Sequence, residues 1–213
     1  MADCLAEPVG AGSWRAVGFE GGENAGDLAA AALDPELGLL IVQPLFVNHP
    51  QLDRIFSGCL NTVRLDTLVE GNDVVIGAAA LKVGTGTAQV DNWSKGSIAV
   101  GIDLNTGRLA RSGVTKAEFG RVRYIAHPNT SVIFSSVVIP HWDKVKQLAR
   151  RSALALLPHR SLGLDIAITQ TGPLVIEANQ TGDFFLLQES VGPLGKSRLA
   201  AAALEIWGER HRV

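Results

Sequence analysis

Hydrophobic and polar positions alternate most regularly over residues 61–69, where Val63 and Leu65 share one parity and Arg64 has the other. Such alternation predicts a β-strand with one buried face. A polar turn follows, and a second apolar run spans residues 74–83. The two runs therefore predict a β-hairpin with two cations, Arg64 and Lys82, near its open end.

A second pair of apolar runs, at residues 164–168 and 174–179, predicts another β-hairpin, with Gly and Pro in the turn between them. Each run contains an acid, Asp165 in the first and Glu177 in the second. With an odd number of residues in the loop, the two acids lie opposite each other. Asn179 then shares the face of Glu177, because side chains alternate with a period of two.

Two opposed carboxylates in such a hairpin favour a metal ion. At about 5 Å they repel by roughly 3 kcal/mol at an effective dielectric constant near 20, and a divalent cation would offset that cost. Ligands that are all oxygen favour Mg²⁺ or Mn²⁺. The alternative is a pair of stray acids, because a slip of one residue puts them on opposite faces. Ion pairs between these acids and nearby arginines would count against the metal.

The rest of the chain predicts an α+β fold with mainly antiparallel strands. Residues 37–42 form an apolar run typical of a buried strand, and residues 84–135 are rich in turns with short strands. A helical period over residues 142–157 ends at a proline, and residues 194–207 predict a closing amphipathic helix.

Composition limits the function classes. The chain has 213 residues, 46% of them hydrophobic and 19% charged, with a net charge of −2, which argues against nucleic acid and an anionic membrane as partners. Cys4 and Cys59 are too few for a disulfide scaffold or a zinc site. No segment resembles a signal peptide or reaches transmembrane length, so we expect a cytoplasmic protein.

Two cations within strands, Arg64 and Lys82, have two interpretations. Long charged side chains in strands usually face solvent, but both could point into a cleft and hold phosphate oxygens. The turn at residues 91–96 (Asp-Asn-Trp-Ser-Lys-Gly) is either a plain loop or a site that presents Asn92 and backbone N–H groups to an anion.

These pieces together resemble ATP-grasp proteins, and most closely the sugar-transfer-associated, glutamate-ligase-like branch. The resemblance covers roughly residues 37–190, and its motifs occur in the order seen in that family. They are Asn61-Thr62-Val63-Arg64, Leu81-Lys82, the run from Val90 to Gly96, Asp165, and Ile176-Glu177-Ala178-Asn179.

The resemblance implies roles for individual residues. Asp165, Glu177 and Asn179 would hold Mg²⁺ ions that bridge the phosphates of ATP, and Arg64 would contact a phosphate or an acyl phosphate. Lys82 stands where the family usually has Arg, which keeps the charge but loses the bidentate fork.

Asn92 would lie near the transferred phosphoryl group. Where the family tends to have paired glycines, this chain has Gly96 followed by a serine. The run Leu40-Ile41-Val42-Gln43 with Asn48-His49-Pro50 resembles the hinge that holds adenine, so Val42, Gln43 and Leu45 would contact the nucleotide.

The family closes ATP between two subdomains, and the smaller one supplies lysines and a glycine-rich loop. Residues 1–36 are too short for all of it and would be a remnant or an extension, with the nucleotide- and metal-binding domain at residues 37–213. No lysine precedes Lys82. The chain thus resembles the C-terminal half of the fold, and a second copy or a partner chain could complete the cleft. The apolar N-terminal strand and residues 184–187 are candidates for the surface that such a chain would cover.

The preferred function is an ATP- and Mg²⁺-dependent ligase-type domain that joins a carboxylate to an amine, or a thiol, through an acyl phosphate. Two alternatives stay open: a non-catalytic nucleotide- or metal-binding module, and a small-molecule kinase. The sequence identifies no general base, because His49 and His127 each precede a proline and are typical of structural turns.

Overall fold

The structure is a computed structural model in which the chain forms two compact units, residues 1–46 and 47–213. In the first unit, strands β1 (Leu5–Pro8) and β2 (Trp14–Val17) pair antiparallel. The expected strand at residues 37–42 and the expected domain boundary near residue 36 lie outside the described residues. The structure describes residues 5–8, 14–17, 46–180, 184–201 and 204.

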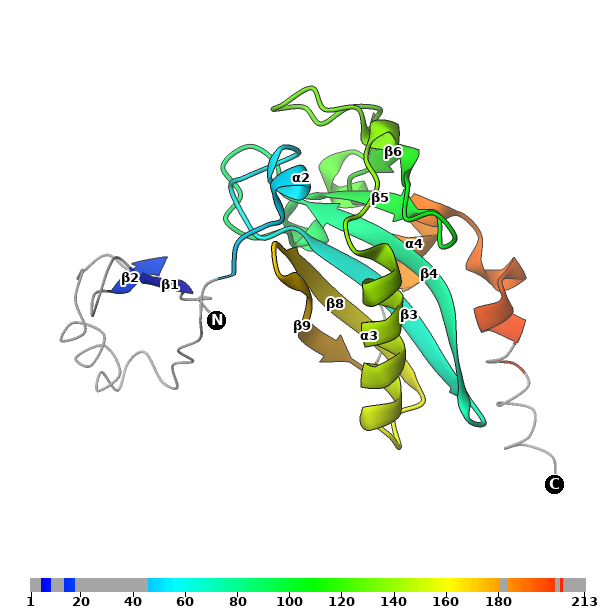
Figure 1. Cartoon of the computed structure of the whole chain (residues 1–213). Helices are drawn as coiled ribbons and strands as arrows, with labels where there is room; N and C mark the ends of the chain where they lie inside the picture. Colours follow the sequence, from blue (N-terminus) through cyan, green and yellow to red (C-terminus); the bar gives the residue numbers. More distant parts are fainter. Residues whose placement is uncertain (1–4, 9–13, 18–45, 181–183, 202–203, 205–213) are drawn as a thin grey trace, which may run out of the picture. The chain divides into compact units, whose positions relative to one another are not determined.

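The described part of the second unit contains a seven-stranded antiparallel sheet in the order β7-β6-β5-β4-β3-β8-β9 (Figure 1). The expected α+β fold with mainly antiparallel strands is confirmed. The strands are β3 (Thr62–Glu70), β4 (Asp73–Val83), β5 (Ile98–Ile102), β6 (Leu109–Val114), β7 (Arg123–Tyr124), β8 (Ser161–Thr169) and β9 (Gly172–Asn179).

Helices cover both faces of this sheet. They are α2 (Pro50–Asp53), α3 (Trp142–Ala155) and α4 (Phe184–Val191), with 3₁₀ turns η1 (Trp93–Lys95), η2 (Ala117–Phe119), η3 (Phe134–Ser136) and η4 (Leu194–Lys196). Helix α3 forms as its period predicts, with Val145, Ala149 and Ala153 buried on one side. Among the described residues, none of the helices combines the length and apolarity needed to span a bilayer.

The two faces of the sheet differ in character. Val63, Leu65, Leu81 and Leu164 point to one face and share the main apolar core with α3. The alternate residues of β4 point to the other face, where Ala78 and Ala80 pack with Leu186 and Leu187 of α4. Because the strand period is two, every charged residue between the apolar positions of β3, β4 and β8 lies on the α4 face.

The β8–β9 hairpin reaches its expected register by an unexpected route. The loop between Thr169 and Gly172 has two residues, an even number, so the condition of an odd loop is not met. Continued without interruption, that register would set Asp165 opposite Ile176. A β-bulge shifts the pairing between Ile166 and Asp165, and Asp165 consequently lies opposite Glu177.

The β3–β4 hairpin also combines a short turn with a bulge. Gly71, at φ 58°, begins the two-residue turn in the left-handed conformation that glycine tolerates best. The pairing shifts between Asp66 and Thr67, which leaves Gly77 as the extra residue of β4. A Cβ there would lie 2.4 Å from the Cβ of Leu199, so this bulge lets the C-terminal segment approach the sheet.

Two C-terminal expectations need correction in detail. The expected helix from Leu194 begins instead as the turn η4, and residues 198–201 and 204 are helical, while 205–207 lie outside the described residues. The run at 184–187 is only half exposed: Phe184 and Phe185 face solvent, whereas Leu186 and Leu187 are in the core.

Candidate functional site

A cluster of charged side chains lies on the α4 face, on three adjacent strands. Arg64 comes from β3, Lys82 from β4 and Asp165 from β8, and Arg64 is the register partner of Asp165. All three are buried, with 8%, 8% and 4% of their surface exposed. The sequence left open whether Arg64 and Lys82 face solvent or point into a cleft. Their burial excludes the solvent-facing orientation.

Asp165 joins the two cations. The guanidinium of Arg64 donates from Nε to Oδ1 at 2.8 Å and from a terminal nitrogen to Oδ2 at 2.9 Å. The ammonium nitrogen of Lys82 lies 3.2 Å from the same Oδ2. A bidentate arginine pair is among the strongest charge-assisted contacts in proteins, and leaving either partner alone in this buried place would cost several kcal/mol.

Asp91 extends the cluster, and sequence reasoning missed it. Its Oδ2 accepts hydrogen bonds from the backbone N–H of Thr62 at 2.6 Å and from the Thr62 hydroxyl at 2.5 Å, and its Oδ1 lies 3.6 Å from Lys82. Burial raises the pKa of the Asp91 carboxyl, and Lys82 and Thr62 oppose that rise. The signal for Asp91 in the sequence was its position directly before Asn92 in the polar turn.

The expected metal ligands are only partly brought together. Glu177 and Asn179 lie in β9, the edge strand, opposite Asp165 and Gly163 respectively. Glu177 is exposed, whereas Asp165 is buried against its cations. Among the described residues, no three His, Cys, Asp or Glu side chains gather closely enough to hold a metal ion.

The donor set still suits a hard cation. Two carboxylates and an amide oxygen from neighbouring register positions are the ligands that Mg²⁺ prefers. A carboxylate has about four lone-pair positions, and the contacts from Arg64 and Lys82 use three of those on Asp165. The arginine pair counts against a metal held mainly by Asp165 while that pair is intact. The assignment of Asp165, Glu177 and Asn179 stays a prediction.

Asn92 caps the 3₁₀ turn η1. Its Oδ1 accepts hydrogen bonds from the backbone N–H of Ser94 at 3.2 Å and from the Ser94 hydroxyl at 2.8 Å, and the side chain is exposed. The turn ends at Gly96 with φ 95°. Trp93 anchors it by donating from its indole nitrogen to the carbonyl of Val114 at 3.0 Å. Asn92 is thus held beside Asp91, and its role toward a phosphoryl group stays a prediction.

The predicted hinge is described only in its second half. Val42, Gln43 and Leu45 lie outside the described residues. Asn48 is buried and bonds to the backbone at Cys59 and Asn61, each at 2.8 Å. These bonds fix the loop that leads into β3.

The histidines have structural contacts, as expected of residues before proline. His49 caps α2 and donates its backbone N–H to Ile168 at 2.7 Å. His127 is buried, with Nε2 2.8 Å from the carbonyl oxygen of Gly84, and desolvation lowers the pKa of its ring.

Burial raises the pKa of Cys59 to about 12, which keeps it a thiol.

One of the comparisons with known proteins found a match. The family model described as sugar-transfer associated ATP-grasp matches residues 28–198 of the chain. Neither the curated proteins nor the solved structures yielded a match.

Proposed function

Since the chain belongs to the sugar-transfer associated ATP-grasp family, we propose that its α4 face binds ATP with Mg²⁺ and activates a carboxylate as an acyl phosphate. An amine or a thiol then captures the acyl group. Family membership makes the chain an ATP-binding, ligase-type domain in general. The metal, the intermediate and the substrates are the parts that we propose.

One observation supports this proposal above the others, the buried set of Arg64, Lys82 and Asp165 on a single sheet face. Burying two cations costs desolvation free energy, and apolar side chains would fill the same place without that cost if the role were purely structural. Phosphoryl transfer uses such groups directly, because most of its catalysis is positioning and charge neutralisation.

The residues that would hold Mg²⁺ are Asp165, Glu177 and Asn179, and the ion would neutralise charge on the phosphate oxygens of ATP. Arg64 binds phosphate oxygens through its planar fork, for which it exchanges one or both of its bonds to Asp165. Lys82 supplies a second positive charge without that directional constraint. Asp91 keeps Lys82 in place, as a positioning residue that does not touch the substrate.

The experiment is a thermal-shift measurement on the whole chain with ATP plus Mg²⁺ and with ATP plus a chelator. We expect a clearly larger rise in melting temperature with the metal than with the chelator, because a ligand that binds the folded state alone stabilises it. Mass spectrometry of reactions with carboxylates and amines then separates a ligase from a kinase, which would release the phosphorylated acid. No shift with Mg·ATP at millimolar concentration would contradict the proposal.

A second candidate, a nucleotide- or metal-binding module without turnover, is favoured by the pairing inside the cluster. Arg64 and Lys82 already have carboxylate partners in Asp165 and Asp91. Such a closed cluster could serve binding or assembly alone. Turnover of ATP by the isolated chain with a candidate acid and amine would exclude this second function.

A further inference from the structure

The outer side of α3, on the sheet face away from the charged cluster, contains a basic groove. A hollow of about 560 Å³ lies between α3 and the first residues of β9, a size typical of small-molecule sites. Its lining has three cations, two apolar side chains, one amide and no acid. These residues are Lys144, Gln147, Leu148, Arg150, Arg151 and Pro173.

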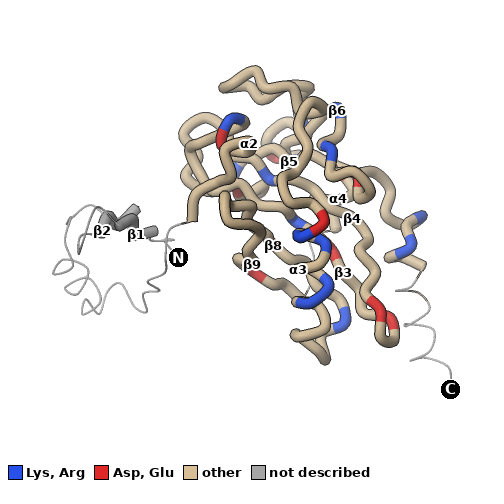
Figure 2. The backbone as a smooth tube through the Cα atoms, viewed as in Figure 1, with Lys and Arg blue, Asp and Glu red and all other residues tan. Residues whose placement is uncertain are grey.

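The cations of this groove lack ion partners in the described part of the chain. Helix α3 contains four basic residues and one acid, Asp143, in a protein whose net charge is −2 (Figure 2). Asp143 pairs with Lys146 at 3.0 Å, and Lys146 does not line the groove. The three cations that do line it form no ion pair with a described residue, and each is exposed. Their charge is therefore available to a ligand.

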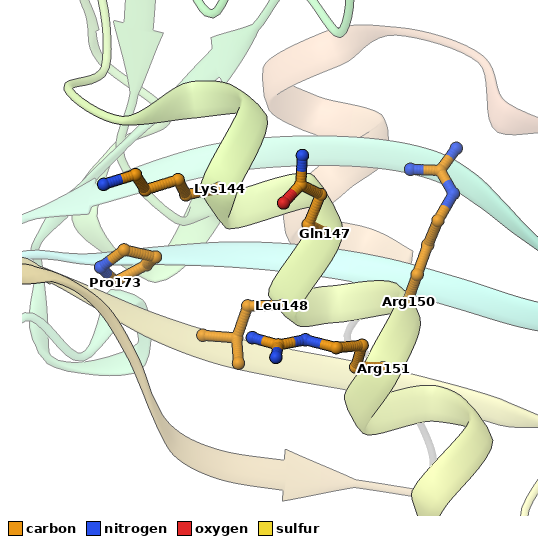
Figure 3. Close-up of a pocket in the computed structure, with 6 residues that line it drawn as sticks. All are labelled: Lys144, Gln147, Leu148, Arg150, Arg151 and Pro173. Atoms are coloured by element: carbon orange, nitrogen blue, oxygen red, sulfur yellow. The ribbon is translucent and has the colours of Figure 1, made fainter.

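The side chains are arranged around an apolar floor. Lys144, Leu148 and Arg151 follow each other at i, i+4 and i+7, which places them on one stripe of the helix. Figure 3 shows Lys144 and Arg151 extending to the side of Pro173 with Leu148 between them, whereas Arg150 points away. The stripe and the proline together form a floor with a cation at each end.

We propose that this groove binds a soluble ligand that contains a diphosphate linked to an organic ring. Lys144 and Arg151 are two helical turns apart, about 10 Å along the axis, so two linked anionic groups contact both cations better than one. Arginine binds phosphate oxygens in pairs, and lysine adds a compact charge. Leu148 and Pro173 offer carbon surface to the ring. The groove is separate from the proposed ATP site because α3 and the charged cluster lie on opposite faces of the sheet.

The test is calorimetry with inorganic pyrophosphate, in chelator and low salt, on the whole chain. We expect wild-type protein to bind it, and binding to weaken as ionic strength rises. Lys144→Gln with Arg151→Gln should weaken the affinity at least tenfold. Lys146→Gln removes one positive charge, half the change of the double variant, from the same helix outside the groove and should leave the affinity within about twofold. All variants change exposed or half-exposed side chains, and their melting temperatures serve as the check on folding.

Several results would overturn the proposal. They are an absence of pyrophosphate binding, or an equal loss of affinity in Lys146→Gln and in the double variant. Sedimentation with phosphatidylglycerol vesicles separates a lipid headgroup from a soluble source. Vesicle binding that the double variant abolishes and pyrophosphate does not displace would assign the groove to a membrane surface instead.

Discussion

The two faces of the central sheet are made by the same strands and have opposite chemistry. On β8, Leu164 is fully buried in the core under α3, while the next residue, Asp165, joins the charged cluster on the other side. Both are buried, but one removes apolar surface from water and the other removes charge. The comparison teaches that burial alone does not separate residues that fold the protein from residues kept for chemistry.

The charged face is expected to be the more sensitive one to a single change. Arg64→Met leaves the buried Asp165 with Lys82 as its cationic partner among the described residues and should cost about 3–5 kcal/mol of the free energy of unfolding. Urea denaturation measures this loss in the free energy of unfolding. Adding Asp165→Leu should recover much of the loss, because the uncompensated charge disappears. Strictly additive losses in the double variant would contradict a tight pair.

A substitution on the apolar face should lower the stability of the protein without changing its affinity for Mg·ATP. Leu164→Ala removes a fully buried side chain and should cost about 2–5 kcal/mol, since it leaves a cavity under α3. The folded protein should keep its affinity for Mg·ATP within about twofold, as measured by calorimetry below the melting temperature. A large loss of affinity from this variant would show that the two faces are not separable.

Asp91 tests whether the cluster extends beyond its three central residues. Asp91→Asn weakens the contacts to Thr62 and Lys82 and should cost about 1.5–3 kcal/mol in urea denaturation. Because Lys82 then keeps only its contact to Asp165 and is held less firmly, the affinity for Mg·ATP should fall about tenfold. Thr62→Val removes only the hydroxyl donor and should show part of the same effect. If the losses from these two variants simply add in the double variant, Asp91 and Thr62 do not act as one unit.

The smallest expected effect is a dependence of stability on pH, caused by His127 on the apolar face of the sheet. Desolvation holds the pKa of His127 below its ordinary value of 6.5 in the folded state. The folded state thus binds fewer protons than the unfolded state, so stability is complete above pH 6.5 and falls as the pH is lowered below it.

The matched variant is His127→Gln, whose amide can still donate to the carbonyl of Gly84. Its stability should depend less on pH between 6.5 and the folded pKa, with a remainder from His49, whose pKa is also lowered. Urea midpoints across that range measure the difference. If the urea midpoint of the variant changes with pH as steeply as that of the wild-type protein, His127 does not cause the pH dependence.

Local pattern was enough to predict the two hairpins and α3. The alternation around Arg64 and the helical period from Trp142 are properties of neighbouring residues, and both elements formed as expected. The pairing of Arg64 with Asp165 joins residues 101 positions apart. It depends on the β3–β8 register, which a single sequence does not contain.

The opposition of Asp165 and Glu177 was predicted for a reason that proved wrong. It depends on the bulge at Ile176 and not on the loop length. A bulge is set by how an edge strand packs, so the local pattern gave no sign of it. Asp91 was missed for a related reason, since it lies in a loop and its partners Thr62 and Lys82 come from two different strands.

The most direct test of the account is calorimetry of Mg·ATP binding with Glu177→Gln. Glu177 is exposed, so the variant should fold normally, and Glu118→Gln is a matched control at an exposed acid in η2. The account predicts that wild-type protein and Glu118→Gln bind Mg·ATP alike and that Glu177→Gln loses the part of this binding that requires Mg²⁺. Unchanged affinity in Glu177→Gln would contradict the claim that this face holds the nucleotide through a metal.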